Sequence, residues 1–250
     1  MIDTYYQPDL AWVHHTGYSQ HVERTGAGIV RLLREGGLSA RARVLDVGCG
    51  SGLLARKLLD SGFAVQGVDA SPAMIEIARE YAPGADFKAV RLPTGLPAGA
   101  ADVLPQADAV VSTGHVLNYL DTRDEIARAL AELARAVRPG GVLAIDLMTE
   151  RFRERRDVGN VHAKVTDDWA IVTRFSCPEA HRLDRTITVF RRVGDQWRRS
   201  DEHHRNVTFD EEEARGVLRD NGIDVRQRVA FGDEQLPEGL VVLTGIRSAP

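Results

Sequence analysis

Residues 43–52 read RVLDVGCGSG, and no other stretch of the chain is as informative. The apolar residues 44–47 lead directly into three closely spaced glycines, Gly48, Gly50 and Gly52, and a helical pattern follows. This order predicts a strand, a tight glycine loop and the start of a helix. Such a loop lets a ligand lie against bare backbone, close to the unpaired N–H groups at the beginning of the helix. The run therefore predicts a ligand site.

Two carboxylates narrow the chemistry of that ligand. Asp46 lies just before the glycines, where it disfavours a pyrophosphate and favours a cationic group. The spacing G-x-G-x-G also departs from the G-x-G-x-x-G fingerprint of dinucleotide-binding loops. Asp69 ends the next apolar run, 64–68, and a carboxylate about 20 residues after such a loop typically binds ribose hydroxyls. The pair indicates a nucleoside that carries positive charge and no phosphates, which fits S-adenosylmethionine.

The two segments LDVGCGSG (45–52) and GVDASPAMIEIAR (67–79) resemble motif I and the second-strand acid of class I S-adenosylmethionine-dependent methyltransferases. The resemblance covers residues 40–148. It implies that the glycine loop binds the methionine end of the donor, that Asp69 takes the ribose hydroxyls, and that S-adenosylhomocysteine is the product. The donor-binding positions expected on this basis are Asp46, Gly48, Cys49, Gly50, Gly52, Asp69, Ala70, Met74, Arg91, Leu92, Ser112 and Tyr18.

Strand and helix patterns alternate up to residue 148. The expected strands are 43–47, 64–69, 86–91, 107–112 and 141–147, and the expected helices between them are 52–61, 72–82 and 122–137. Ser71 and Pro72 are a cap and a first-turn proline for the second of these helices. Alternation of this kind predicts a doubly wound, mostly parallel seven-stranded sheet with helices on both faces. The ligand should bind beyond the carboxyl ends of the strands.

The pattern changes between residues 151 and 207, where four extended segments replace the helices. Gly194-Asp195 is a hairpin turn between the last two of them. We expect a small antiparallel β cap over the acceptor site, inserted after the fifth strand. Residues 1–150 and 208–250 then form the Rossmann-like domain, with lid helices within residues 1–40. The final elements are a helix over 209–221, capped by Thr208 with Glu211 as its capping box, and an antiparallel pair of strands, 223–231 and 240–247.

The cap region is also similar to that of sugar N-methyltransferases. The shared segments are S-T-G-H at 112–115 and HHRNVTFDEEEARGVLRDNGI at 203–223. The resemblance implies that the cap sheet covers the acceptor and sets its specificity. It also implies that the N-terminal helices, with His14, His15, Tyr5 and Tyr6, fold over the donor as a lid.

His115 follows the fourth strand and is the candidate general base for an acceptor that must lose a proton. A role in lining the pocket is the alternative. Asn118 and Tyr119 come next, and Tyr119 is either a pocket residue or a core aromatic. No metal site is expected, because the fourth strand lacks a terminal carboxylate. Consecutive histidines on a strand, such as His203-His204, also point to opposite faces.

Composition and charge restrict the classes of function that remain. A net charge of −4 over 250 residues offers no strong field for nucleic acid or an anionic membrane. The two cysteines, Cys49 and Cys177, are expected to be reduced thiols in a cytoplasmic protein, and the N-terminus has no signal-peptide pattern. We expect a monomer or homodimer that acts on a small-molecule N or O acceptor. A regulatory protein that binds the donor without catalysis and an RNA methyltransferase remain as alternatives, and a pyridine-dinucleotide dehydrogenase is opposed by Asp46.

Overall fold

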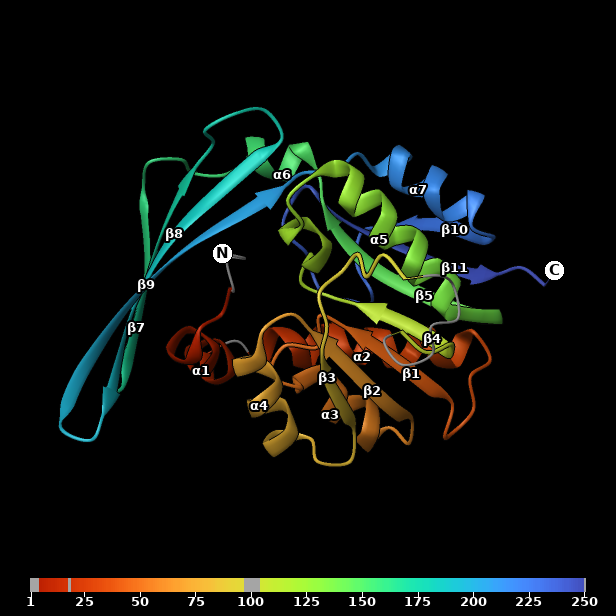
Figure 1. Ribbon diagram of the computed structural model, residues 1–250, viewed down its shortest axis with the longest axis horizontal. Helices are drawn as coiled ribbons and strands as arrows, with labels where there is room; N and C mark the ends of the chain where they lie inside the picture. The colour runs from red at the N-terminus through yellow and green to blue at the C-terminus, as the bar shows by residue number, and fades with distance from the viewer. Residues whose placement is uncertain (1–4, 18, 97–103, 250) are drawn as a thin grey trace.

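The computed structural model describes residues 5–17, 19–96 and 104–249. Within them, seven strands form one sheet in the order β10-β11-β5-β4-β1-β2-β3 (Figure 1). The strands from β3 to β5 are parallel, whereas β11 is antiparallel to both of its neighbours. The antiparallel pairing of β10 with β11 was predicted. The bounds are β1 (Arg43–Val47), β2 (Ala64–Asp69), β3 (Asp86–Ala89), β4 (Ala107–Ser112), β5 (Val137–Met148), β10 (Ile223–Arg228) and β11 (Leu240–Arg247).

Helices cover both faces of this sheet. One apolar core lies under α5 (Arg123–Ala136) and α7 (Glu211–Asp220). The other lies under α2 (Ser19–Glu35), α3 (Leu53–Asp60) and α4 (Pro72–Tyr81). No helix in the described part of the chain is long and apolar enough to cross a membrane. The doubly wound architecture expected from the alternating pattern is therefore confirmed.

The strand order reverses between β1 and β4, which lie side by side in the middle of the sheet. Ligands of open α/β sheets bind at this point, beyond the carboxyl ends of the strands. The glycine loop follows β1, and the 3₁₀ helix η1 (Val116–Tyr119) follows β4. The topology therefore brings the loop after residue 47 and the segment after residue 112 to one edge of the sheet.

A second sheet, here called the cap sheet, has four antiparallel strands in the order β6-β7-β8-β9. They are β6 (Val161–Val165), β7 (Trp169–Ser176), β8 (Arg182–Val193) and β9 (Gln196–Val207), and they follow β5 and α6 (Glu150–Glu154). The predicted insertion and its hairpin turn at Gly194 are confirmed. The helix α1 (Pro8–Gly17) packs Leu10 and Val13 on Trp169 and Ile187 of this sheet, between it and α4 (Figure 1).

Two local expectations are wrong. The strand β5 begins at Val137, four residues earlier than predicted, because the chain pairs with Ala107 before a register shift. Thr208 does not cap α7. Its hydroxyl donates to Glu150, while the side chain of Asp210 accepts the N–H groups of Glu212 and Glu213. The intervening Phe209 is 1% exposed, so the chain first buries this ring and then begins the helix.

Candidate active site

In the glycine loop after β1, three backbone N–H groups donate to acceptors within the protein. The N–H groups of Gly48 and Cys49 donate to the carbonyl of Val68, at 2.7 and 3.0 Å, and the N–H of Gly50 donates to Asp69 Oδ2 at 2.9 Å. The N–H groups of Gly48, Cys49 and Gly50 are therefore occupied, whereas the start of α3, where unpaired N–H groups were expected, has no side-chain cap among the described residues. A phosphate would find these donors already occupied, which favours a ligand without phosphates.

The conformation of the loop explains two of its glycines. Gly48 has φ +69°, and a Cβ at this position would lie 2.3 Å from Cγ2 of Val116. Gly50 has φ +51°, but a Cβ there would meet nothing within 4 Å. Gly48 therefore lets η1 approach the loop, whereas Gly50 leaves open space beside the backbone.

Gly48→Ala is expected to destabilise the protein more than Gly50→Ala. Both substitutions place a side chain at positive φ, which costs about 1 kcal/mol. Only Gly48→Ala adds a clash with Val116, worth about 1–3 kcal/mol more. Thermal unfolding of the two variants measures the difference, and equal melting temperatures would contradict this packing.

Asp46 is an unsatisfied carboxyl group of the site. It is 1% exposed, and its Oδ2 atom has no hydrogen-bond partner among the described residues. Burial, and secondarily the charge of Asp69, raise the pKa of Asp46 to about 7. A buried carboxylate that lacks a partner is stabilised by a cationic group, so the ammonium or sulfonium of the expected donor fits this environment.

Asp69 ends β2 and organises the neighbouring turn. Its Oδ1 accepts the N–H of Ser71 at 2.8 Å, and its Oδ2 accepts the N–H of Gly50. Burial raises the pKa of Asp69, and these backbone N–H groups oppose that shift. Ser71 also caps α4 as predicted, by accepting the N–H of Met74 at 3.2 Å. The carboxylate is held at the sheet edge, and each oxygen keeps a lone pair for a ligand hydroxyl.

The other expected donor-binding residues lie in different environments. Met74 and Leu92 are buried, and Ser112 is fully buried with an Oγ that has no hydrogen-bond partner in the described part of the chain. Ala70 and Arg91 are exposed, and Arg91 forms an ion pair with Asp121 at 2.8 Å. The side chain of Cys49 lies in the apolar core, so only its backbone remains available to a ligand. Tyr18 lies outside the described residues.

His115 lies in a strained turn that Asp146 holds. Its φ is +49°, in the left-handed region. Asp146 accepts the N–H of His115 at 2.6 Å and that of Gly114 at 3.0 Å. Burial raises the pKa of Asp146 to about 6, although these N–H groups oppose the shift. The His115 ring stacks parallel to that of Tyr119, with centroids 6.3 Å apart.

A polar cluster joins η1 to the cap sheet. The hydroxyl of Tyr119 lies 2.9 Å from that of Tyr6, accepts from Arg185 of β8, and lies 3.4 Å from Nδ1 of His204. His204 is fully buried, and its Nε2 lies 2.8 Å from Glu202. Burial lowers the pKa of His204, while Glu202 opposes that shift. Tyr119 is therefore a residue of this cluster rather than only a core aromatic.

The N-terminal segment contacts both the glycine loop and the cap sheet. Nδ1 of His15 lies 2.9 Å from the hydroxyl of Ser51, in the glycine loop. The hydroxyl of Ser71 donates to the carbonyl of Tyr6 at 2.8 Å, and Glu202 accepts the N–H of Tyr6 at 2.7 Å. Tyr6 thus bridges the turn of Asp69 and the cap sheet.

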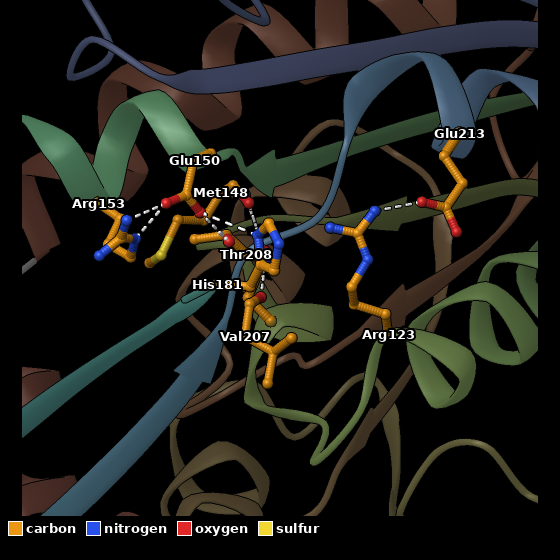
Figure 2. A network of polar contacts seen from close by, with 9 residues as sticks. Arg123, Met148, Glu150, Arg153, His181, Val207, Thr208 and Glu213 are labelled. Carbon is orange, nitrogen blue, oxygen red and sulfur yellow. Dashed lines mark hydrogen bonds and ion pairs between the residues drawn. The ribbon is translucent and has the colours of Figure 1, made fainter. Parts of the chain in front are cut away.

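Glu150 ties α6 to the end of β9 (Figure 2). Its carboxylate accepts from the hydroxyl of Thr208 at 2.7 Å, pairs with Arg153, and lies 3.3 Å from Nδ1 of His181. These contacts fix the helix that carries Phe152, whose ring lies 6.0 Å from that of His115.

Asn118 fixes η1 to the ends of β5 and β9. Its amide donates to the carbonyls of Met148 and Val207, at 2.9 and 2.6 Å, and its Oδ1 accepts the N–H of Met148 at 2.8 Å. Asn118 therefore links the ends of β5 and β9 through its side-chain amide.

The histidine pairs do not gather into a metal site. His203 and His204 point to opposite sides of β9, toward Asp184 and Glu202 respectively. Within the described ranges, no three His, Cys, Asp or Glu side chains are placed to hold a metal ion.

Sequence reasoning missed Asp146, Arg185, Glu202 and the buried role of His204. A signal for the last two was present in β9. Glu202, His204 and Asn206 alternate along the strand, and a polar set with a period of two predicts a buried polar face when the surrounding strands are apolar. All three side chains are buried.

Residues 44–141 match a family model described as a methyltransferase domain. YqeM of Bacillus subtilis (strain 168), described as a methyltransferase, is 25% identical over 202 residues, which are 78% of this chain and 79% of that protein. The sugar N-methyltransferase KedS8 of Streptoalloteichus sp ATCC 53650 has a TM-score of 0.80 at 20% identity, over 100% of this chain and 97% of its own.

The S-adenosylmethionine-bound CalS10 of Micromonospora echinaspora, an amino pentose methyltransferase, has a TM-score of 0.74 at 25% identity, over 99% of this chain and 100% of its own. These likenesses agree with the glycine loop, whose Gly48, Cys49 and Gly50 N–H groups have protein acceptors, and with the buried Asp46, whose Oδ2 has no partner among the described residues. Residues 44–141 are therefore a methyltransferase domain, and the chain has the fold of S-adenosylmethionine-dependent methyltransferases that include sugar N-methyltransferases.

Proposed function

We propose that the chain methylates a nitrogen or oxygen atom of a small molecule held between η1 and the cap sheet. The observation that carries this proposal is a hydrogen-bonded path from Asp69 through Ser71, Tyr6 and Tyr119 to Arg185. It connects the turn that would bind the donor ribose with the cap sheet. An acceptor bound beside Tyr119 would then lie next to the donor.

The position of each segment suggests its role. Residues 151–207 act as the cap over the acceptor, and the N-terminal segment, with His15 on Ser51, acts as the lid over the donor. The remaining residues, 1–150 and 208–250, form the catalytic domain. The amino pentose named for CalS10 makes an amino sugar a suitable first acceptor class to test.

The bound donor supplies a methyl group that its sulfonium already activates. The protein must align the two reactants, exclude water and remove a proton. Asp46 orients the cationic end of the donor, and Asp69 holds its ribose. As the acceptor N or O atom bonds to the methyl carbon and the C–S bond breaks, His115 accepts the proton of the acceptor. Its turn is held in place by Asp146.

A screen with labelled donor tests the reaction. We expect the purified chain to transfer label to an amine, a hydroxylated small molecule or an amino sugar. The donor-binding variant Asp69→Asn, assayed at a donor concentration well below its Kd, serves as the low-activity control. Donor binding without transfer to any acceptor would instead indicate a regulatory protein. Transfer to RNA, with binding that weakens steeply as salt rises, would overturn the small-molecule proposal.

Asp46→Asn is expected to stabilise the donor-free protein and to weaken donor binding. The pKa of Asp46 is about 7 in the folded protein, above its ordinary value of 3.8. Between these values the folded state keeps a proton that the unfolded state has lost. Stability therefore falls as pH rises through this window, by at most about 4 kcal/mol. Asp46→Asn has no carboxyl group to ionise at this position, so its stability does not fall for this reason.

Thermal unfolding between pH 3 and pH 8 measures the effect on stability. The melting temperature of the donor-free wild type should fall relative to that of Asp46→Asn as pH rises. Below pH 4 the difference between the two melting temperatures should stay constant. Donor affinity of the wild type should rise from pH 6 to pH 8, because the ionised carboxylate binds the cation. Parallel melting temperatures throughout would show that Asp46 is not a raised, unpartnered acid.

A further inference from the structure

The proposed donor site extends along three neighbouring strands of the large sheet, in the order β1-β2-β3 (Figure 1). The cationic end of the donor is placed at Asp46 of β1, and the ribose at Asp69 of β2. The adenine is attached to the ribose on the side away from the sulfonium, so it continues toward the end of β3. Val90, the first residue after β3, donates its N–H to the carbonyl of Asp69 at 2.8 Å. The segment that begins at Val90 is therefore the next part of the chain that the base meets.

An ion pair lies at this place. Nη2 of Arg91 donates to Oδ2 of Asp121 at 2.8 Å, and the pair joins the segment after β3 to the segment after η1. The neighbours of the two charged residues, Leu92 and Leu120, are buried in one apolar cluster with Val68 of β2. These apolar contacts hold both backbones beside β2, while the charged side chains stay 37% and 56% exposed. A ligand at the sheet edge can therefore reach the polar atoms of the pair.

The ion pair has hydrogen-bonding capacity to spare. Among the described residues, it engages only one guanidinium nitrogen of Arg91, Nη2, and one carboxylate oxygen of Asp121, Oδ2. A guanidinium has only N–H donors and a carboxylate has only acceptors. The pair therefore presents a donor and an acceptor side by side, in a fixed order, to a planar ligand with the complementary pattern.

We propose that Arg91 and Asp121 recognise the Watson–Crick edge of the donor's adenine. This edge carries an amino group at N6, which donates, next to N1, which accepts. Asp121 accepts from the N6 amino group and Arg91 donates to N1, so the ion pair remains intact when the base is bound. This inference rests on the proposed function, because it needs the ribose at Asp69.

The same pair discriminates against a base with the reverse pattern. Hypoxanthine has an acceptor oxygen at position 6 and an N–H donor at N1. Its oxygen would face the carboxylate of Asp121, and its N–H would face the guanidinium of Arg91. Two like groups would then be opposed in place of two hydrogen bonds, which is the repulsive element that specificity requires. Arg91 and Asp121 therefore determine the specificity of the donor site for adenine.

Titration calorimetry of the full chain with S-adenosylhomocysteine and S-inosylhomocysteine tests this assignment, because the two ligands differ only in the base. The wild type should bind the adenosyl ligand at least about 10-fold more tightly than the inosyl ligand. Asp121→Ala should weaken binding of the adenosyl ligand about 10-fold and should not weaken binding of the inosyl ligand. Arg91→Met keeps the apolar stem but removes the donors, so it should reduce the discrimination in the same way.

Asp124→Ala is the matched control, because Asp124 is an exposed acid at the start of α5 that pairs with Arg128 at 3.1 Å. Its affinities for both ligands should equal those of the wild type. The N–H of Asp121, which donates to Glu125 at 2.9 Å, is retained in Asp121→Ala. Both variants lose one exposed ion pair, so their melting temperatures should stay close to that of the wild type.

Two results would overturn the assignment while the donor site stands. One is equal affinity of the wild type for the two ligands, and the other is equal affinity of Asp121→Ala and Asp124→Ala for the adenosyl ligand. Absence of binding of both ligands would overturn the proposed donor site together with this inference. Methyl transfer is judged separately, by the screen with labelled donor, which does not depend on the inosyl ligand.

Discussion

His115→Asn is expected to lower kcat by about 10²–10⁴-fold while donor affinity stays at the wild-type value. Asparagine is the informative replacement, because it tolerates the left-handed backbone of His115, at φ +49°, better than alanine does. The main-chain N–H that Asp146 accepts is also retained. The amide side chain cannot take up a proton near neutral pH, so the variant removes the base without removing the turn.

Steady-state kinetics across pH 6–9 separate the two roles proposed for His115. If the imidazole is the base, the pH dependence of kcat that it contributes disappears in the variant. His203→Asn is the matched control, because His203 is an exposed histidine that contacts Asp184 on the cap sheet. Retention of full turnover by His115→Asn across this range would leave His115 as a residue that only lines the pocket.

Asp69→Asn is expected to weaken S-adenosylmethionine binding about 100-fold. A hydrogen bond to a charged acceptor contributes about 1.5–3 kcal/mol, and Asp69 is proposed to accept from the ribose hydroxyls. Asparagine keeps the shape of the side chain and one acceptor oxygen. The N–H groups of Ser71 and Gly50 now bind separate carboxylate oxygens, so the variant also loosens one backbone contact.

A second ligand separates these two effects. Binding of 2′,3′-dideoxy-S-adenosylhomocysteine should already be weak in the wild type and should change little on Asp69→Asn, because this ligand has neither of the hydroxyls that Asp69 is proposed to bind. Equal losses with the dideoxy and the parent ligand would assign the effect to the turn rather than to the ribose.

The donor half of the molecule could be predicted from the sequence because its determinants are local. The strand, the glycines and Asp69 lie within 27 residues of each other along the chain, between positions 43 and 69. Apolar periodicity and turn residues over so short a range restrict the backbone strongly. The occupation of the Gly48, Cys49 and Gly50 N–H groups was not predicted, since their acceptors, Val68 and Asp69, lie in the next strand. That contact depends on strand pairing rather than on the loop itself.

The acceptor half could not be predicted in the same way. Tyr6, Tyr119 and Arg185 meet across sequence separations that no local pattern reports. The same limit explains the wrong cap at Thr208, where burial of Phe209 and the contact with Glu150 outweigh a favourable capping-box pattern. Arg156 belonged to a run of arginines that looked like a solvated face. Only the tertiary contacts show that it alone in this run lacks an acid within the described structure.

The most direct test of the account is a calorimetric titration of the purified chain with S-adenosylmethionine, followed by one with NAD. The geometry of the glycine loop, with Asp46 buried and unpartnered and the loop N–H groups occupied, predicts a saturable isotherm of one S-adenosylmethionine per chain and no binding of NAD. Absence of heat with S-adenosylmethionine, or binding of NAD to the same site, would contradict it.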